Sequence, residues 1–264
     1  MSAKKNQKFL ISGGPANNLI ATLERYVYDN PSCTNEALHF SDLNLREIAL
    51  QSSVISETTA LHKILNELAY IDFYLYLYDD IDWCENIFDF ANYAAEMFPW
   101  MNIATPIEFT LKDKEIVHAA REKYAKMFLG GITQIVNSAF AYLWMRKQLL
   151  HDFNLKLSRE ISPLLKNVHP ELASDGKIHR PSYIPKWLRD ALLHRDRGSC
   201  HYCGTLVASP LVQNQDFQID HMVPLALGGT NDPTNFVISC GTCNNQKSAK
   251  LQSISDAFHW PNRF

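Results

Sequence analysis

The chain has 264 residues, of which 46% are hydrophobic and 20% are charged, and its formal net charge is −3. These values are typical of a globular chain with room for two domains. The sequence contains no internal repeat and no low-complexity tract, and the residues before Gly13 lack the apolar core of a secretory signal, so we expect a cytoplasmic protein.

The first two thirds of the sequence predict a mainly α-helical domain over residues 1–170. The uncharged run from Met127 to Met145 separates apolar and polar residues onto two faces, which favours a buried helix over a membrane-spanning one. Ser41 is a predicted N-cap. Apolar residues recur at helical spacing in four further stretches: Leu19–Tyr28, Ser41–Tyr70, Lys112–Phe128 and Ser158–Leu165.

Charge is distributed unevenly along the chain. Residues 1–175 hold 16 Lys/Arg and 22 Asp/Glu, a net charge of −6, whereas residues 176–264 hold nine and six, a net charge of +3. The stretch Ile64–Leu111 contains nine Asp/Glu and no Lys or Arg. Such a surface repels polyanions, so it predicts either a protein-partner site, including a cover over the basic part of the chain, or an acidic exterior over an aromatic core.

The domain border is predicted between Asn167 and Ser182, where His169-Pro170 and Ser174-Asp-Gly176 interrupt the helical periodicity. A basic cluster follows this border. It predicts either a phosphate-binding surface or an ordinary solvated face. Its members are Lys177, Arg180, Lys186, Arg189, Arg195 and Arg197.

Four cysteines form two CxxC pairs, Cys200–Cys203 and Cys240–Cys243. A two-residue spacer lets both sulfurs of one turn reach the same ion, so two such pairs predict a closed tetrahedral zinc site. A redox pair and two disulfides are the alternatives, and the recurrence of the pair after 36 residues, without a secretory signal, favours zinc. Cys33 and Cys84 stand alone and are predicted to be buried apolar side chains.

The segment between and after these pairs predicts a strand, a loop, a second strand and a helix. Phe217–Val223 alternates apolar and polar residues, as a half-buried strand does, and Gly228-Gly229 then marks a loop. Asn235–Ser239 predicts the returning strand. Asn244–Gln252 lacks Gly and Pro and predicts a short helix. We therefore expect a small α+β unit that the zinc knuckles tie together.

This segment resembles the HNH, or ββα-metal, endonuclease family. The resemblance covers the last third of the chain and implies a nuclease domain at residues 176–264 with the ββα-metal fold, stapled by a zinc ion bound to four cysteines. Asn244 stands where many members have a second His, so the segment is similar to the H-N-N variant. The matching positions are Cys200, Cys203, Asp220, His221, Pro224, Gly228, Gly229, Asn235, Cys240, Cys243, Asn244 and Lys247.

The resemblance also implies roles for these residues. His221 is the expected general base, because an imidazole can take a proton from water near neutral pH, and Asn235 is expected to fix the loop and orient His221. Asp220 and Asn244 offer oxygen ligands, which favour Mg²⁺ or Mn²⁺ as the catalytic ion, while the four cysteines hold structural Zn²⁺. The ordinary alternative for Asn235 is a turn residue. The residues expected to contact nucleic acid are Lys247, Arg195, Arg197, Arg189 and Lys186.

The resulting hypothesis is a metal-dependent endonuclease that cuts DNA, in anti-phage defence or restriction. An RNA-cutting, toxin-like nuclease and a zinc ribbon that only binds nucleic acid are the alternatives. If the acidic stretch covers the basic residues, a fragment beginning near Gly176 is expected to cut DNA better than the full chain.

Overall fold

The computed structural model describes residues 14–28, 43–78, 132–208, 217–252 and 254. Several predicted features lie outside these residues. They are the helix Lys112–Phe128, the N-cap Ser41, Cys33, Cys84 and residues 79–111 of the acidic stretch.

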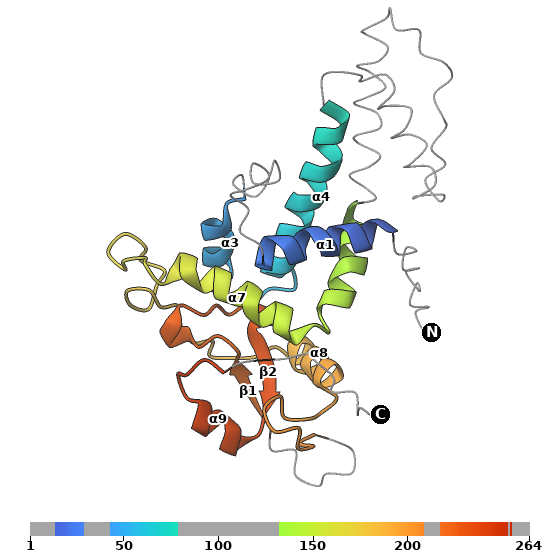
Figure 1. The fold of residues 1–264 in the computed structure, drawn as a ribbon. Helices are drawn as coiled ribbons and strands as arrows, with labels where there is room; N and C mark the ends of the chain where they lie inside the picture. The colour runs from blue at the N-terminus through green and yellow to red at the C-terminus, as the bar shows by residue number, and fades with distance from the viewer. Residues whose placement is uncertain (1–13, 29–42, 79–131, 209–216, 253, 255–264) are drawn as a thin grey trace, which may run out of the picture.

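Helices dominate the described residues between 14 and 161, which are called the helical region here. They are α1 (Gly14–Tyr28), α3 (Leu45–Gln51), α4 (Ala60–Tyr78), a helix over residues 132–143 and α7 (Lys147–Ile161). In Figure 1, α7 runs between α1, α3 and α4 on one side and the small sheet on the other. Among the described residues, no helix is long and apolar enough to cross a membrane.

Two predicted helices have different bounds in the structure. The expected helix Ser41–Tyr70 is interrupted at residues 52–59, where the hydroxyl of Ser52 donates a hydrogen bond back to the carbonyl of Ile48 (2.8 Å). Ser and Thr side chains bond to nearby backbone groups in this way and so favour helix ends. The expected helix Ser158–Leu165 is the end of α7, which stops at Ile161 ahead of Pro163.

The uncharged stretch 127–145 behaves as predicted where it is described. Residues 132–143 are helical, and the apolar face is buried while Thr133 and Asn137 are exposed. The buried residues are Ile132, Ile135, Val136, Ala139 and Leu143.

The second half of the structure contains a ββα unit, defined here as residues 218–247. Strand β1 (Gln218–His221) pairs antiparallel with β2 (Phe236–Ser239), with His221 opposite Phe236, and α9 (Gly241–Lys247) follows. Helix α8 (Lys186–Asp196) packs against β2. The predicted helix Asn244–Gln252 begins three residues too late and ends five residues too late. The observed helix starts at Gly241, where the Cys240 sulfur caps it by accepting the N–H of Cys243 (3.4 Å).

Strand β2 contributes to two hydrophobic clusters. Its Val237 belongs to the large cluster that α1, α3, α4 and α7 build, together with Met222. Phe236 and Ile238 belong to a smaller cluster with α8 and the first zinc knuckle. Strand β2 is therefore buried on both faces, and the core of the helical region continues into the ββα unit.

Candidate active site and metal centre

The four cysteines of the two CxxC pairs converge on one point. Their sulfur atoms all lie within 4.8 Å of one another, and those of Cys203 and Cys240 are 3.9 Å apart. Thiolates bound tetrahedrally to zinc at about 2.3 Å lie about 3.8 Å from one another. The knuckle geometry is set by hydrogen bonds from Gly204 N–H to the Cys200 carbonyl and from Cys200 N–H to the Thr205 carbonyl. The cluster can therefore hold a zinc ion, and this ion would join the knuckle ahead of β1 to the start of α9.

Asp220 lies near the end of β1 and is held by two neighbours. Its Oδ2 accepts a hydrogen bond from the Tyr202 hydroxyl (2.8 Å) and is 3.0 Å from the ammonium of Lys247. Burial, followed by the charge of Asp220, raises the pKa of Tyr202, so this phenol keeps its proton and remains a donor. The carboxylate is thus fixed through one oxygen, and its second oxygen is available as a metal ligand.

His221 follows on the same strand and is 5% exposed. Its Nε2 is 3.0 Å from Oδ1 of Asn231, and its ring lies against the ring of Phe236, with centroids 4.4 Å apart. Burial lowers the pKa of His221 to about 4, while the hydrogen bond to Asn231 and the charge of Asp220 partly oppose this shift. The imidazole is therefore neutral at pH 7, the form that can accept a proton.

Asn235 has no exposed surface, and its side chain makes three hydrogen bonds. Its Nδ2 donates to the carbonyls of Val223 (3.0 Å) and Thr230 (2.9 Å), and its Oδ1 accepts the N–H of Val223 (2.8 Å). These bonds connect Val223, two residues after His221, with Thr230 in the loop between the strands. The position of Asn235 is therefore suited to fixing the conformation of this loop.

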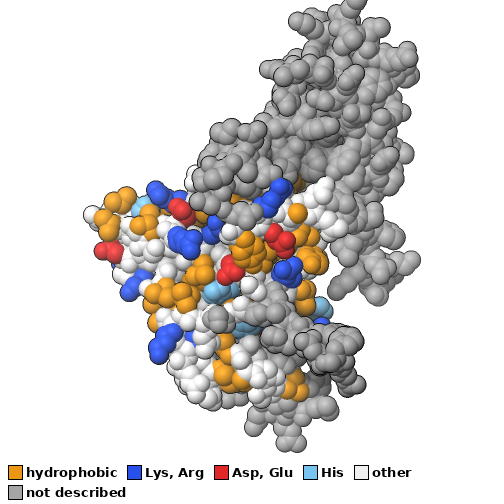
Figure 2. Space-filling model, in the orientation of Figure 1, with side chains coloured by type: hydrophobic (Ala, Val, Ile, Leu, Met, Phe, Trp, Pro, Cys, Tyr) orange, Lys and Arg blue, Asp and Glu red, His pale blue; other side chains and the backbone are white. Residues whose placement is uncertain are grey.

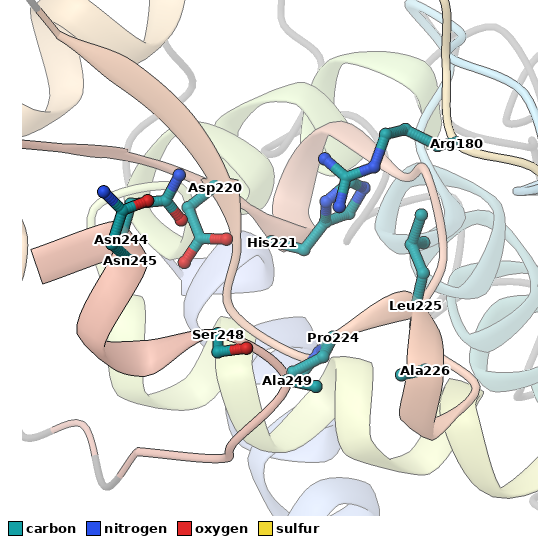
Figure 3. A pocket seen from close by; sticks show the side chains of 10 residues that line it. All are labelled: Arg180, Asp220, His221, Pro224, Leu225, Ala226, Asn244, Asn245, Ser248 and Ala249. Carbon is teal, nitrogen blue, oxygen red and sulfur yellow. The ribbon is translucent and has the colours of Figure 1, made fainter. Parts of the chain in front are cut away.

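A pocket of about 360 Å³ opens beside these residues. Figure 3 shows Asp220 with Asn244 and Asn245 on one side and His221 with Arg180 on the other. The amide of Asn244 donates to the side-chain oxygen of Gln218 (2.5 Å), which fixes the orientation of Asn244 beside Asp220. A carboxylate and an amide oxygen in one polar pocket are a donor set that fits Mg²⁺ or Mn²⁺. The remaining lining residues are Pro224, Leu225, Ala226, Ser248 and Ala249.

Two of the five residues expected to contact nucleic acid are buried. Lys247 is 2% exposed, pairs with Asp220 and donates to the carbonyl of His221 (2.7 Å). Arg195 is 3% exposed, lies over the ring of Trp144 and donates to Asp196 and the carbonyl of Phe236. The expectation for these two cations needs correction, because each one already compensates buried acceptors and neither presents its charge to a phosphate at the surface.

The other three expected residues are exposed. Arg189 lies over the ring of Phe217, Lys186 pairs with Asp190 (2.5 Å), and Arg197 ends α8 in the left-handed conformation. On the face seen in Figure 2, Lys and Arg side chains lie among acidic and apolar ones and form no continuous patch over the described residues. Of the basic cluster, Arg180 is the member that lines the pocket.

Sequence reasoning missed the residues that support this site. Tyr202 holds Asp220 from inside the first knuckle, and Asn231 contacts His221 from the loop between the strands. Arg180 was predicted only as one cation of a cluster. The available signal for Asn231 was a run of polar residues, Thr230-Asn-Asp232, between the glycine pair and Asn235.

The loop over residues 228–235 is inserted into the helical region. The carboxylate of Asp232 accepts the N–H of Ala60, which is the first residue of α4, and the N–H and hydroxyl of Thr234. The amide of Asn154 in α7 donates to the Thr234 hydroxyl (2.9 Å). A Cβ at Gly228 would lie 2.6 Å from the carbonyl oxygen of Ser158 in α7, so this close approach requires glycine.

Comparison with protein families finds that residues 200–250 match the model of the HNH endonuclease family. Comparison with curated proteins and with solved structures gave no match. The matched range contains the four cysteines, both strands, α9 and the residues that line the pocket, apart from Arg180. Residues 200–250 therefore form an HNH endonuclease domain, which implies a nucleic acid as the substrate class.

Proposed function

We propose that this protein is a metal-dependent endonuclease that hydrolyses DNA phosphodiester bonds, with His221 as the general base. The main support is the composition of the pocket. A neutral imidazole, a carboxylate and an amide, from His221, Asp220 and Asn244, line the same pocket. Phosphodiester hydrolysis needs a group that takes a proton from water and a charge that stabilises the phosphoryl and leaving oxygens.

In the proposed reaction, a water beside His221 attacks phosphorus and gives its proton to Nδ1 of the ring, while Nε2 remains bonded to Asn231. The bond from phosphorus to the 3′-oxygen breaks, and that oxygen leaves with the electron pair. A Mg²⁺ or Mn²⁺ ion held by Asp220 and Asn244 would stabilise the negative charge. The guanidinium of Arg180 lies across the pocket from Asp220 and can bind a phosphate oxygen.

Lys247 then does not bind a phosphate, although the sequence predicted that it would. Together with Tyr202, it holds Asp220. Both bind Oδ2 of Asp220, and Lys247 also binds the carbonyl of His221. They hold two consecutive residues of β1 in fixed orientation. The buried lysine also supplies a positive charge beside a carboxylate that is itself only partly exposed, which lowers the cost of burying both.

The zinc ion proposed for the four cysteines is structural. Four protein ligands close the coordination shell and leave no position for water or substrate. On the resemblance to the HNH family alone, we propose a setting in anti-phage defence or restriction.

The test is cleavage of supercoiled plasmid and of RNA by the zinc-loaded full chain, with Mg²⁺, Mn²⁺ or EDTA. We expect metal-dependent cutting of DNA and a decrease of roughly 10²- to 10⁴-fold for His221→Ala, the usual effect of removing a positioned base. Asn167→Ala, at an exposed position, is the control. Cleavage of RNA alone supports the toxin-like nuclease, and binding without cleavage supports the non-catalytic zinc ribbon. Full activity of His221→Ala refutes the proposed base.

A further inference from the structure

Asn231 connects the proposed base to two segments that are distant in sequence. Its Oδ1 is 3.0 Å from Nε2 of His221, and its Nδ2 donates to the carbonyls of Ser53 (2.7 Å) and His179 (2.8 Å). The Asn231 backbone N–H also donates, to the carbonyl of Ser52 (2.9 Å). The residue is 2% exposed, so water does not substitute for these partners.

This hydrogen-bond pattern fixes which ring nitrogen of His221 carries the proton. The two carbonyl oxygens of Ser53 and His179 can only accept, so the atom of Asn231 that faces them must be the NH₂ group. The atom facing His221 is then the amide oxygen, which also can only accept. Nε2 of His221 must therefore be the donor, and Nδ1 keeps the lone pair that a general base uses.

We propose that Asn231 is a positioning residue for the base, and that the turn between α3 and α4 belongs to the active site because it holds Asn231. The proposal rests on the proposed role of His221. Its structural basis is independent of that role, since Ser52 and Ser53 bind the Asn231 backbone and side chain, and Asp232 beside it caps α4. The helical region thus sets the orientation of an imidazole on β1.

Two substitutions separate positioning from mere stability. Asn231→Leu removes the acceptor for Nε2 and both donated hydrogen bonds. Asn231→Asp also loses both donated bonds and places an anionic oxygen beside two carbonyls, so it destabilises the fold at least as much. Asn231→Asp nevertheless keeps an oxygen opposite Nε2. Positioning therefore predicts that Asn231→Leu is the slower enzyme, although Asn231→Asp is no more stable.

The first experiment records long-range ¹⁵N–¹H spectra of the zinc-loaded full chain, with His221→Gln to assign the signal of the ring. We expect the Nε2–H tautomer in the wild type and in Asn231→Asp, and a mixture of tautomers in Asn231→Leu. The Nδ1–H tautomer in the wild type, or an unchanged tautomer in Asn231→Leu, overturns the proposal. The wild-type spectrum can refute the proposal even if neither variant folds.

The second experiment measures plasmid cleavage per folded molecule, well below the melting temperature of each variant. We expect Asn231→Leu to lower kcat by roughly 10- to 100-fold with little change in KM, the usual effect of losing a group that orients a reactive one, and Asn231→Asp to retain more activity. Asn167→Asp, an exposed position, is the matched control. If kcat follows stability, so that Asn231→Asp is the slower variant, the proposal fails. An inactive wild type refutes the nuclease proposal instead, and the tautomer still tests this one.

Discussion

The two ends of the ββα unit are held by different chemistry. At one end, four sulfurs within 4.8 Å of one another form a site for zinc. At the other end, the loop over residues 228–235 is held by buried hydrogen bonds to α4, α7 and the turn between α3 and α4. Metal ligation contributes on the order of 10 kcal/mol in small modules, whereas one buried hydrogen bond contributes about 1 kcal/mol. A zinc ion would therefore fasten one end locally, while the other end depends on the helical region.

Removing a thiolate gives the largest expected effect. Cys200 is 2% exposed and belongs to the cluster around β2, so Cys200→Ser is expected to lose zinc and to unfold the HNH domain. Thr242→Ala, an exposed change inside the second knuckle, is the control. Elemental analysis and circular dichroism are measured together. A folded, zinc-free Cys200→Ser protein contradicts a structural role for the metal.

Removing the helical region is expected to be nearly as severe. A fragment that begins at Gly176 exposes Met222 and Val237 and leaves Asp232 and Thr234 without their partners in α4 and α7. We expect no cooperative unfolding transition and little cleavage, even with zinc. This reverses the expectation of restraint by the acidic domain. A fragment that is folded and cuts DNA faster than the full chain contradicts the present account and restores restraint.

A single substitution tests the polar end alone. Every partner of the Asp232 carboxylate is a donor, so Asp232→Asn directs an NH₂ group at another donor and leaves buried groups unpaired. We expect a loss of about 2 to 4 kcal/mol in the free energy of unfolding, by analogy with other broken buried networks. Chemical denaturation with zinc content held constant measures this. Asn167→Asp serves as the surface control, and an unchanged midpoint for Asp232→Asn refutes the importance of this loop contact.

The smallest expected effect is a pH dependence from the helical region. Burial lowers the pKa of His62 to about 4, below the ordinary value of about 6.5, so the folded state favours the neutral ring. Its contribution to stability is present above about pH 6.5 and is lost as pH falls towards 4. His62→Gln removes this titration, so the stability of the wild type relative to the variant should decline from pH 7 to pH 5. A constant difference in melting temperature contradicts the assignment.

The sequence predicted the parts of the site whose chemistry is local. The two-residue spacer of each CxxC pair lets both sulfurs reach one ion, and the Asp220-His221 dipeptide places both groups at one strand end. The alternation in Phe217–Val223 predicted the strand correctly, apart from its ends. Each of these predictions needed only neighbours within a few residues or a repeated motif.

The sequence could not predict contacts that join distant segments. Asn231 and Ser53 are 178 residues apart, and no spacing rule connects them. Lys247 was expected to reach a phosphate because it lies one turn after Asn244, but the last turn of α9 faces Asp220 and the carbonyl of His221. The break at residues 52–59 had a local signal in its serines and threonines, which the apolar periodicity on both sides outweighed.

We infer that the helical region and the HNH domain unfold as one cooperative body. Native-state hydrogen exchange of the zinc-loaded full chain tests it most directly, through the amides of Phe153 in α7 and of Val237 and Ile238 in β2. We expect these amides to exchange with the same opening free energy, and we expect Asp232→Asn to lower it equally in α7 and β2. Opening of β2 at a lower free energy than α7, with Asp232→Asn affecting only β2, would contradict the claim.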